Sequence, residues 1–202
     1  TAVHILERAA LRPGDTVLVQ GTGAVGLSAI ALARLNGAST IVAIGATDDR
    51  LRLAKRMGAD HVCDVTTSSR EERLEQVRAL THGEGVDVAL EAAGAAAAIE
   101  EGLDLVRDGG RYVIAGHYTD VGDSTINAHR QINRKHLEIR GCWGSEPGHF
   151  LRALSFLERY AASVPWREIG GRTYPLTGLN DALRDAESMR ITKALVDPWM
   201  AA

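Results

Sequence analysis

Cysteine and aromatic residues are both scarce in this chain of 202 residues, and each scarcity excludes a class of protein. Cys63 and Cys142 are the only cysteines, they lie far apart, and neither belongs to a CxxC pair. The sequence therefore indicates neither a disulfide framework nor a structural zinc site. Aromatic residues make up 4% of the chain, too few for the stacking platforms that bind single-stranded nucleic acid.

An excess of positive charge and a long apolar run are also missing. The net charge of −3 argues against binding to nucleic acid or to an acidic membrane surface. No apolar run is long enough to span a bilayer and there is no signal-peptide pattern, so we expect a cytoplasmic protein. The sequence opens at Thr1, without an initiator Met, inside a helical pattern. We therefore expect it to be part of a longer protein.

Strand and helix patterns alternate along most of the chain. The strand segments are residues 16–20, 40–45, 61–65, 86–94, 110–116 and 136–143, and the intervening helical segments are residues 24–35, 48–57, 70–80 and 97–105. Continuous apolar strands that alternate with helices are typical of a parallel sheet covered on both faces. The sequence thus predicts an α/β protein with a Rossmann fold, a six-stranded, parallel, doubly wound sheet with helices on both faces.

The alternation stops after about residue 145. There the pattern predicts a helix at 149–160, a short strand at 169–174, a polar helix at 179–188 and a strand at 193–197. These elements are not another strand–helix repeat. We therefore divide the chain into a Rossmann domain at 1–145 and a separate tail at 146–202.

A GxGxxG motif follows the first predicted strand and opens a long helix. Gly21 would allow the tight turn, Gly23 would let the backbone approach a pyrophosphate, and Gly26 would let the helix pack close to the strand. The N-terminus of such a helix offers unpaired N–H groups and positive potential to phosphates. The motif alone is weak, but this context favours a dinucleotide-binding loop over a purely structural turn.

The end of the second strand bears on the choice of cofactor. In this fold an acidic residue roughly twenty positions after the glycine loop grips the adenosine ribose. Gly45 stands there, followed by Ala46 and Thr47, so we expect no repulsion and room for a 2′-phosphate. Arg50 could pair with that phosphate or simply with Asp49. The sequence therefore predicts NAD(P), leaning to NADP.

Five segments, in order, carry a resemblance to a known family. They are "GDTVLVQGTGAVGLSAIALARLNGAS", "RLRLAKRMGADHV", "GVDVALEAAG", "GGRYVIAGHY" and "HLEIRGCWG". The chain resembles the zinc-type alcohol dehydrogenases of the medium-chain dehydrogenase/reductase superfamily over essentially its whole length. The resemblance implies that a GroES-like catalytic domain precedes the Rossmann domain, and that the tail at 146–202 supplies the last pieces of that catalytic domain.

The resemblance also implies roles for individual residues. The pyrophosphate contacts would be Gly21, Gly23, Ala24, Val25 and Gly26. The adenosine ribose would be flanked by Gly45, Ala46, Thr47 and Arg50. The nicotinamide side would be formed by Ala92, Gly94, Ala115, His117 and Cys142. His117 is expected to act through its backbone, and we assign no catalytic residue and no metal ligand in this chain.

Three functions stay open at this point. The first is the cofactor-binding portion of an NAD(P)-dependent alcohol dehydrogenase that acts on a small alcohol or carbonyl compound, with zinc held only by the full-length protein. The second is a zinc-independent quinone or enoyl reductase, and the third is a non-catalytic nucleotide-binding module. The resemblance further implies a homodimer joined through the sixth strand, and Glu138 and Arg140 could pair across an antiparallel two-fold axis. The alternative is a monomer whose edge is protected by these two charges or covered by the tail.

Overall fold

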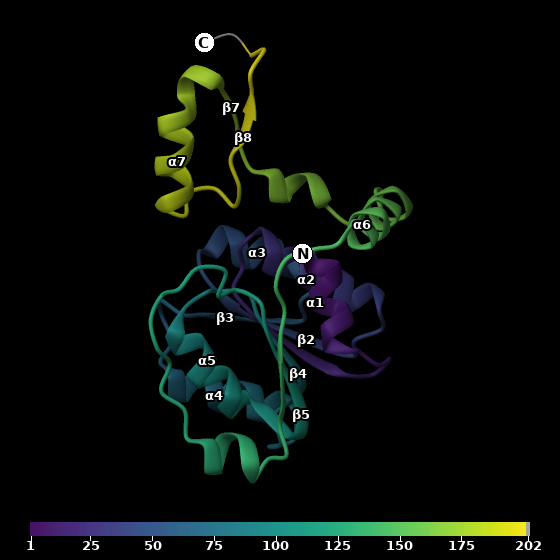
Figure 1. Cartoon of the computed structure of the whole chain (residues 1–202), viewed down its shortest axis with the longest axis vertical. Helices are drawn as coiled ribbons and strands as arrows, with labels where there is room; N and C mark the ends of the chain where they lie inside the picture. The colour runs from purple at the N-terminus through teal and green to yellow at the C-terminus, as the bar shows by residue number, and fades with distance from the viewer. Residues whose placement is uncertain (201–202) are drawn as a thin grey trace.

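A parallel six-stranded sheet forms the centre of the molecule in a computed structural model that describes residues 1–200 (Figure 1). The strands lie in the order β3-β2-β1-β4-β5-β6. Their bounds are β1 Thr16–Gln20, β2 Thr40–Gly45, β3 His61–Asp64, β4 Val86–Glu91, β5 Val106–Ile114 and β6 Glu138–Gly141. This order and the parallel pairing confirm the predicted Rossmann fold.

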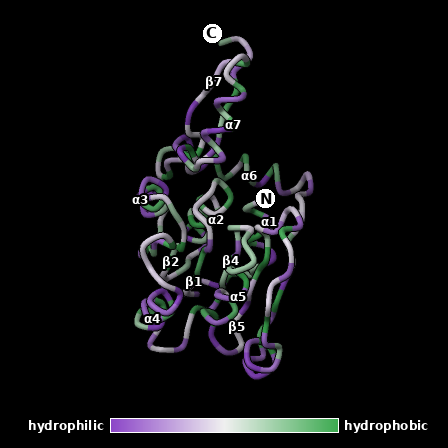
Figure 2. Tube along the Cα trace, turned by 90° about the vertical axis from the view of Figure 1, so that its left-hand side faces the viewer, coloured by the Kyte–Doolittle hydropathy of each residue, from purple (hydrophilic) through white to green (hydrophobic). Residues whose placement is uncertain are grey.

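Helices cover both faces of the sheet. They are α1 Ala2–Ala9, α2 Ala24–Leu35, α3 Asp48–Arg56, α4 Arg70–Leu80 and α5 Ala96–Leu105. The first three pack on one face around Val19 and Ile41, and the last two pack on the other face around Leu18 and Tyr112. The strands are therefore buried from both sides, which explains their continuous apolar sequences. Figure 2 shows the hydrophobic residues gathered along these inner segments.

Local sequence signals fix the ends of the helices. Ser69 and Glu72 form a capping box at the start of α4, in which each side chain accepts a hydrogen bond from the other residue's backbone N–H. Gly58, directly after α3 and Met57, has a φ of +117°, a conformation that glycine adopts without strain. Such signals are readable from the sequence, and the predicted helices of the sheet match the observed ones closely.

The residues after the sheet form a projecting C-terminal segment (Figure 1). It contains α6 Pro147–Arg159, the 3₁₀-helices η2 Trp166–Gly170 and η3 Leu176–Gly178, β7 Thr173–Pro175, α7 Leu179–Glu187 and β8 Leu195–Asp197. Strands β7 and β8 pair in parallel as a separate two-stranded sheet. The segment is attached to the main body through α6, whose buried His149 lies 3.1 Å from the Glu7 carboxylate of α1, and through η2.

Several predicted elements differ in their bounds from the observed ones. The strand predicted at 169–174 was placed too early: residues 169–170 end η2, in which the Pro165 carbonyl accepts from the Glu168 N–H, and only residues 173–174 lie in β7. The strand predicted at 110–116 is β5, which begins at Val106 and ends at Ile114. The sixth strand is shorter than the predicted 136–143. A π-helix, η1 Ala128–Asn133, precedes it and was not predicted.

The charges on β6 also differ from their expected arrangement. Arg140 pairs with Glu138 on the same strand, and its Nη1 donates to the carbonyl of Arg8 at 2.7 Å. Both partners are thus engaged within one chain, whereas the sequence suggested that they could pair across a two-fold axis. Among the described residues, no helix has both the length and the apolar character needed to cross a membrane.

Candidate cofactor-binding site

A cleft of about 450 Å³ lies at the carboxyl ends of the central strands. Strands β1 and β4 are neighbours, yet α2 and α5, which follow them, lie on opposite faces of the sheet. Ligands of open α/β sheets bind at such a switch point. The predicted site residues that line the cleft are Gly21, Gly23, Gly45, Ala46, Arg50 and Ala92.

Gly21 and Gly26 have the structural roles that the motif predicted. Gly21 has a φ of +102°, and a Cβ there would lie 2.6 Å from the carbonyl oxygen of Ala92. A Cβ on Gly26 would lie 1.9 Å from the carbonyl oxygen of Gly21. Both contacts are far too short for a real side chain, so the turn and the close approach of α2 require glycine.

Gly23 differs from its two neighbours in the motif. It is the N-cap residue of α2, and no side chain caps the helix there. A Cβ at this position would meet nothing within 4 Å, so the backbone borders open space. The first N–H groups of an α-helix have no partner within the helix. With Ala24 and Val25 in this first turn, the helix start fits a phosphate group.

The end of β2 packs closely against the glycine loop. A Cβ on Gly45 would lie 2.4 Å from Oγ1 and 2.7 Å from Cγ2 of Thr22, a buried residue of the glycine loop. The Thr22 hydroxyl in turn donates to the carbonyl of Ala46 at 2.8 Å. A side chain at position 45 would therefore meet Thr22, whereas the expected room for a 2′-phosphate beside Gly45 stays a prediction.

Arg50 contacts the C-terminal segment. Its Nη2 donates to the carbonyl of Ile191 at 2.5 Å, and its Nε is buried without a hydrogen-bond partner among the described residues. Burial lowers the pKa of the Arg50 guanidinium from its usual value, although arginine stays protonated in proteins. Asp49, the alternative partner considered for Arg50, pairs with Arg52 instead. Arg50 is thus half-buried at the cleft with one unsatisfied donor.

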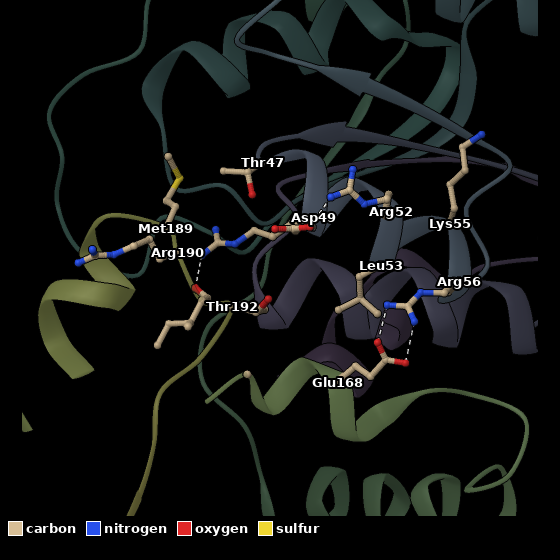
Figure 3. Close-up of a pocket in the computed structure, with 13 residues that line it drawn as sticks. Thr47, Asp49, Arg52, Leu53, Lys55, Arg56, Glu168, Met189, Arg190 and Thr192 are labelled. Carbon is tan, nitrogen blue, oxygen red and sulfur yellow. Dashed lines mark hydrogen bonds and ion pairs between the residues drawn. The ribbon is translucent and has the colours of Figure 1, made fainter. Parts of the chain in front are cut away.

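A second cavity of about 590 Å³ lies beside the cleft, between α3 and the C-terminal segment (Figure 3). Thr47 lines this cavity and not the cleft. Figure 3 shows Glu168 of η2 reaching the guanidinium of Arg56, and Met189 approaching Thr47 from the other side. Arg50 and Met189 line both the cleft and the second cavity, so the segment around Met189 forms a wall shared by the two.

A buried carboxylate fixes the loops that the sequence assigned to the nicotinamide side. Glu91, at the end of β4, is fully buried, and it accepts hydrogen bonds from the N–H groups of Ala93, Gly94 and Gly116 at 2.8, 2.6 and 2.9 Å. Gly94 has a φ of +70°, and its Cβ would lie 2.7 Å from the carbonyl oxygen of Gly116. Glu91 was missed in the sequence; an acidic residue at the end of an otherwise apolar strand was the available signal.

The other predicted residues on this side do not line the cleft. Ala115 follows β5 and donates its N–H to the Glu91 carbonyl at 3.0 Å. The N–H of Cys142 donates to the carbonyl of Ile114 at 2.9 Å and so extends the sheet. Burial raises the pKa of the Cys142 thiol, which keeps the sulfur protonated.

His117 lines a third hollow, of about 410 Å³, beyond the end of β5. Its Nε2 is buried and has no hydrogen-bond partner among the described residues. Tyr118 and Trp143 lie over the same hollow with their rings stacked, 4.7 Å between centroids and 8° between planes. Tyr118 and Trp143 both stand in segments that carry the family resemblance, but neither was assigned a role in a site from the sequence, because their stacking joins two segments that are separate in the sequence.

The described residues contain no group of three or more His, Cys, Asp or Glu side chains placed to hold a metal ion. Cys63 illustrates why: it is buried at β3, its sulfur donates to Oε1 of Gln76 at 3.0 Å, and burial raises the pKa of its thiol. Zinc binds the thiolate. Within residues 1–200 the feature of the cleft that suits a ligand is the open helix start at Gly23, which can accept a phosphate group.

Fold and cleft together define a dinucleotide-binding Rossmann protein. Comparison with known proteins goes further, because the family model described as zinc-binding dehydrogenase matches residues 24–159. The chain therefore belongs to the zinc-binding dehydrogenase family, which confirms the resemblance seen in the sequence.

Individual relatives support the same conclusion. The chain is 31% identical over 183 residues to 5-exo-hydroxycamphor dehydrogenase of Pseudomonas putida, which covers 91% of this chain and 50% of the relative. An alcohol dehydrogenase structure from Thermotoga maritima matches with a TM-score of 0.90 and 31% identity, over 96% of this chain and 53% of the other. A zinc-binding dehydrogenase from Sinorhizobium meliloti 1021, solved bound to NADP, matches with a TM-score of 0.84 and 25% identity, over 98% and 56%. The chain thus spans about half the length of the curated relatives that it matches.

Proposed function

We propose that this chain is the cofactor-binding portion of an NAD(P)-dependent, zinc-type alcohol oxidoreductase. One observation carries the proposal: the start of α2, without a side-chain cap, faces open space at Gly23 inside the cleft at the switch point. A helix start of this kind binds phosphate. When bound, the nicotinamide would exchange a hydride with the carbon of an alcohol or carbonyl substrate.

Different residues of the cleft would bind different parts of the cofactor. The backbone of Gly21, Gly23 and the first turn of α2 would hold the pyrophosphate. Ala46 and Arg50 would border the adenosine ribose. The Glu91 carboxylate keeps the loops after β4 and β5 in place, and these loops would orient the nicotinamide ring. No proton transfer is assigned to a side chain of this chain.

NADP is the proposed cofactor of choice. No carboxylate lines the cleft at the end of β2, and Arg50 has an unsatisfied, buried Nε at this point. A carboxylate there would repel a 2′-phosphate, whereas a guanidinium attracts it. A family member solved with NADP supports this choice for a protein of similar fold.

The remaining parts of the proposal concern the whole protein. The tail at 146–202 would complete a catalytic domain whose other half would carry zinc and face the alcohol. Strand β6 lies at the edge of the sheet and would pair with the same strand of a second copy. The exposed apolar side chains of α6, among them Phe150, Leu151 and Leu154, support a further covering partner of this segment.

Gly23→Val tests the proposed function. The new side chain points into open space, so the fold should survive, but it fills the room that a pyrophosphate needs. Loss of two charge-assisted hydrogen bonds at about 1.5–3 kcal/mol each predicts at least about 100-fold weaker NADPH binding. Nicotinamide fluorescence measures the affinity, and thermal unfolding measures the fold.

Gly148→Val is the matched control, because it places the same side chain in the first turn of α6, away from the cleft and without a close contact. It should bind NADPH as the wild type does. Unchanged affinity in Gly23→Val would contradict the proposed function, and so would a wild-type chain that binds no nicotinamide dinucleotide.

A further inference from the structure

A buried ion pair forms part of the wall of the cleft. Nε and Nη2 of Arg73, on α4, donate to the two carboxylate oxygens of Glu101, on α5, at 2.7 and 3.1 Å. Nη1 of Arg73 also donates to the carbonyl of Ser68. The two residues are 8% and 6% exposed, and both line the cleft. A bidentate pair at this depth holds the guanidinium plane in one orientation.

The Arg73–Glu101 pair lies where the adenosine half of a dinucleotide would bind. If the pyrophosphate lies at the start of α2, the ribose beyond it lies at the end of β2, and the attached base extends toward β3, the next strand of the sheet. On this side the cleft is lined by Ile44 and by Val65 and Thr66, which directly follow β3. Arg73, at the start of the next helix, and Glu101 belong to the same wall.

The chemistry of a fixed guanidinium suits a flat, neutral aromatic ring. Arg73 donates four hydrogen bonds, two to Glu101 and two from Nη1 to the carbonyl and the hydroxyl of Ser68, the last at 3.4 Å. This leaves the planar face and one N–H group of Nη2 for a ligand. Arginine stacks on aromatic faces, and its rigid plane makes it different from lysine in this respect. The apolar neighbours Ile44, Val65 and Ala97 complete a slot for such a ring.

We propose that Arg73, oriented by Glu101, is a specificity-determining residue that recognises the purine base of the bound nucleotide. The proposal rests on the proposed function, because the position of the base is inferred from the proposed pyrophosphate site. It adds a residue that no motif in the sequence marks. Glu101 acts as the positioning residue, since its carboxylate is engaged by Arg73.

Arg73→Lys tests the proposal with two fragments of the cofactor. Lysine keeps the positive charge opposite Glu101 and removes the plane. AMP, which has the purine, should bind about tenfold more weakly, a typical loss for a guanidinium–ring contact. Reduced nicotinamide mononucleotide, which lacks the purine, should bind as before. Calorimetry measures AMP binding, and nicotinamide fluorescence measures the mononucleotide.

Arg70→Ala is the matched control. Arg70 joins the same two helices through Asp104 and the carbonyl of Glu100, but it does not line the cleft. It should leave AMP affinity unchanged. If Arg73→Lys unfolds, the double variant Arg73→Met/Glu101→Gln removes both charges, avoids an unpaired buried ion, and should show the same selective loss of AMP binding.

The outcomes separate this inference from the proposed function. Selective loss of AMP in Arg73→Lys, with Arg70→Ala normal, supports it. AMP affinity within twofold of wild type, equal losses for both fragments, or an equal loss in Arg70→Ala would overturn it while the cleft still binds the cofactor. A wild-type chain that binds neither AMP nor NADPH would overturn both.

Discussion

At the scale of single residues, the contact between Gly45 and Thr22 decides how cofactor choice can be tested. Any side chain at position 45 would meet the Thr22 hydroxyl and methyl group, both in a buried environment. Forcing extra atoms into such packing typically costs about 1–3 kcal/mol. A carboxylate at Gly45 would therefore disturb the glycine loop before it could act on a phosphate. Ala46, the next residue, lines the cleft and already carries a Cβ.

Ala46→Asp should shift the preference from NADPH toward NADH. The new carboxylate would stand at the end of β2, where it repels a 2′-phosphate and can accept hydrogen bonds from ribose hydroxyls. At partly exposed sites such repulsion amounts to about 1–2 kcal/mol, so the ratio of the two dissociation constants should change about tenfold. Fluorescence titration with both cofactors at low and high salt measures it.

The neutral variant Ala46→Asn separates charge from size. It has nearly the same shape and should leave the ratio within about twofold of wild type, because no charge repulsion is introduced. An equal shift in Ala46→Asn, or a wild type that already prefers NADH strongly, would show that the end of β2 does not set the choice in the way proposed.

At the scale of elements, β6 is the edge strand on which a dimer would depend. The N–H of Cys142 donates toward β5, and N–H groups alternate in direction along a strand, so the N–H of Ile139 faces the open edge. Farther along the edge, Nε of Arg8 already donates to the carbonyl of Gly141 at 2.9 Å. The middle of the strand, with Ile139 39% exposed, is therefore the part left for pairing.

Ile139→Pro should weaken the proposed homodimer and leave the sheet of each copy intact. Proline removes the outward donor of the edge and not a donor to β5. Because of the two-fold symmetry, the substitution removes one hydrogen bond from each copy. Each loss should raise the dissociation constant of the dimer about tenfold. Light scattering over a range of protein concentrations measures this, with Ile139→Thr, which keeps the N–H group, as the control. A wild-type monomer at high concentration would refute the dimer.

The predictable part of the fold is the part that is buried from both sides. Strands β1, β2 and β4 and the helices between them are fixed by apolar runs and by glycines at their ends, which are local signals. The C-terminal segment lacks such signals: its strands have three residues each, and Pro165 and Gly171 direct the chain through a 3₁₀-helix. Short elements of this kind depend on contacts that no local pattern records.

The site was predictable to the same extent. The glycine loop follows from a motif whose spacing has a steric cause, and the structure shows that cause at Gly21 and Gly26. The contact of Arg50 with Ile191 joins residues 141 positions apart, and the pair of Arg73 with Glu101 joins two helices. The sequence contains the residue types, but only the folded chain brings these partners together.

At the scale of the whole molecule, the C-terminal segment is not self-sufficient. Strands β7 and β8 form an isolated two-stranded sheet, which is marginally stable by itself. Leu176, Leu183 and Trp199 are 58%, 60% and 89% exposed on this segment. Exposed apolar surfaces of this kind mark sites of contact with another part of a protein or with a partner. Because the curated relatives are about twice as long as this chain, a catalytic half of the same protein is the partner that we propose.

This arrangement predicts that the purified chain binds NADPH but does not oxidise alcohols. The cleft that we propose for the cofactor is lined by residues of this chain, whereas residues 1–200 include no group of side chains placed to hold a zinc ion. Without a Lewis acid to polarise the alcohol oxygen, several kcal/mol of transition-state stabilisation are missing. Turnover, followed by the absorbance of the reduced nicotinamide, should therefore stay at background with zinc added or with a chelator.

Adding the catalytic half as a second polypeptide should restore zinc-dependent turnover and lower the tendency of the chain to aggregate, because it covers the apolar side chains of the C-terminal segment. Zinc-dependent oxidation of an alcohol by the chain alone would show that its own residues complete the active site.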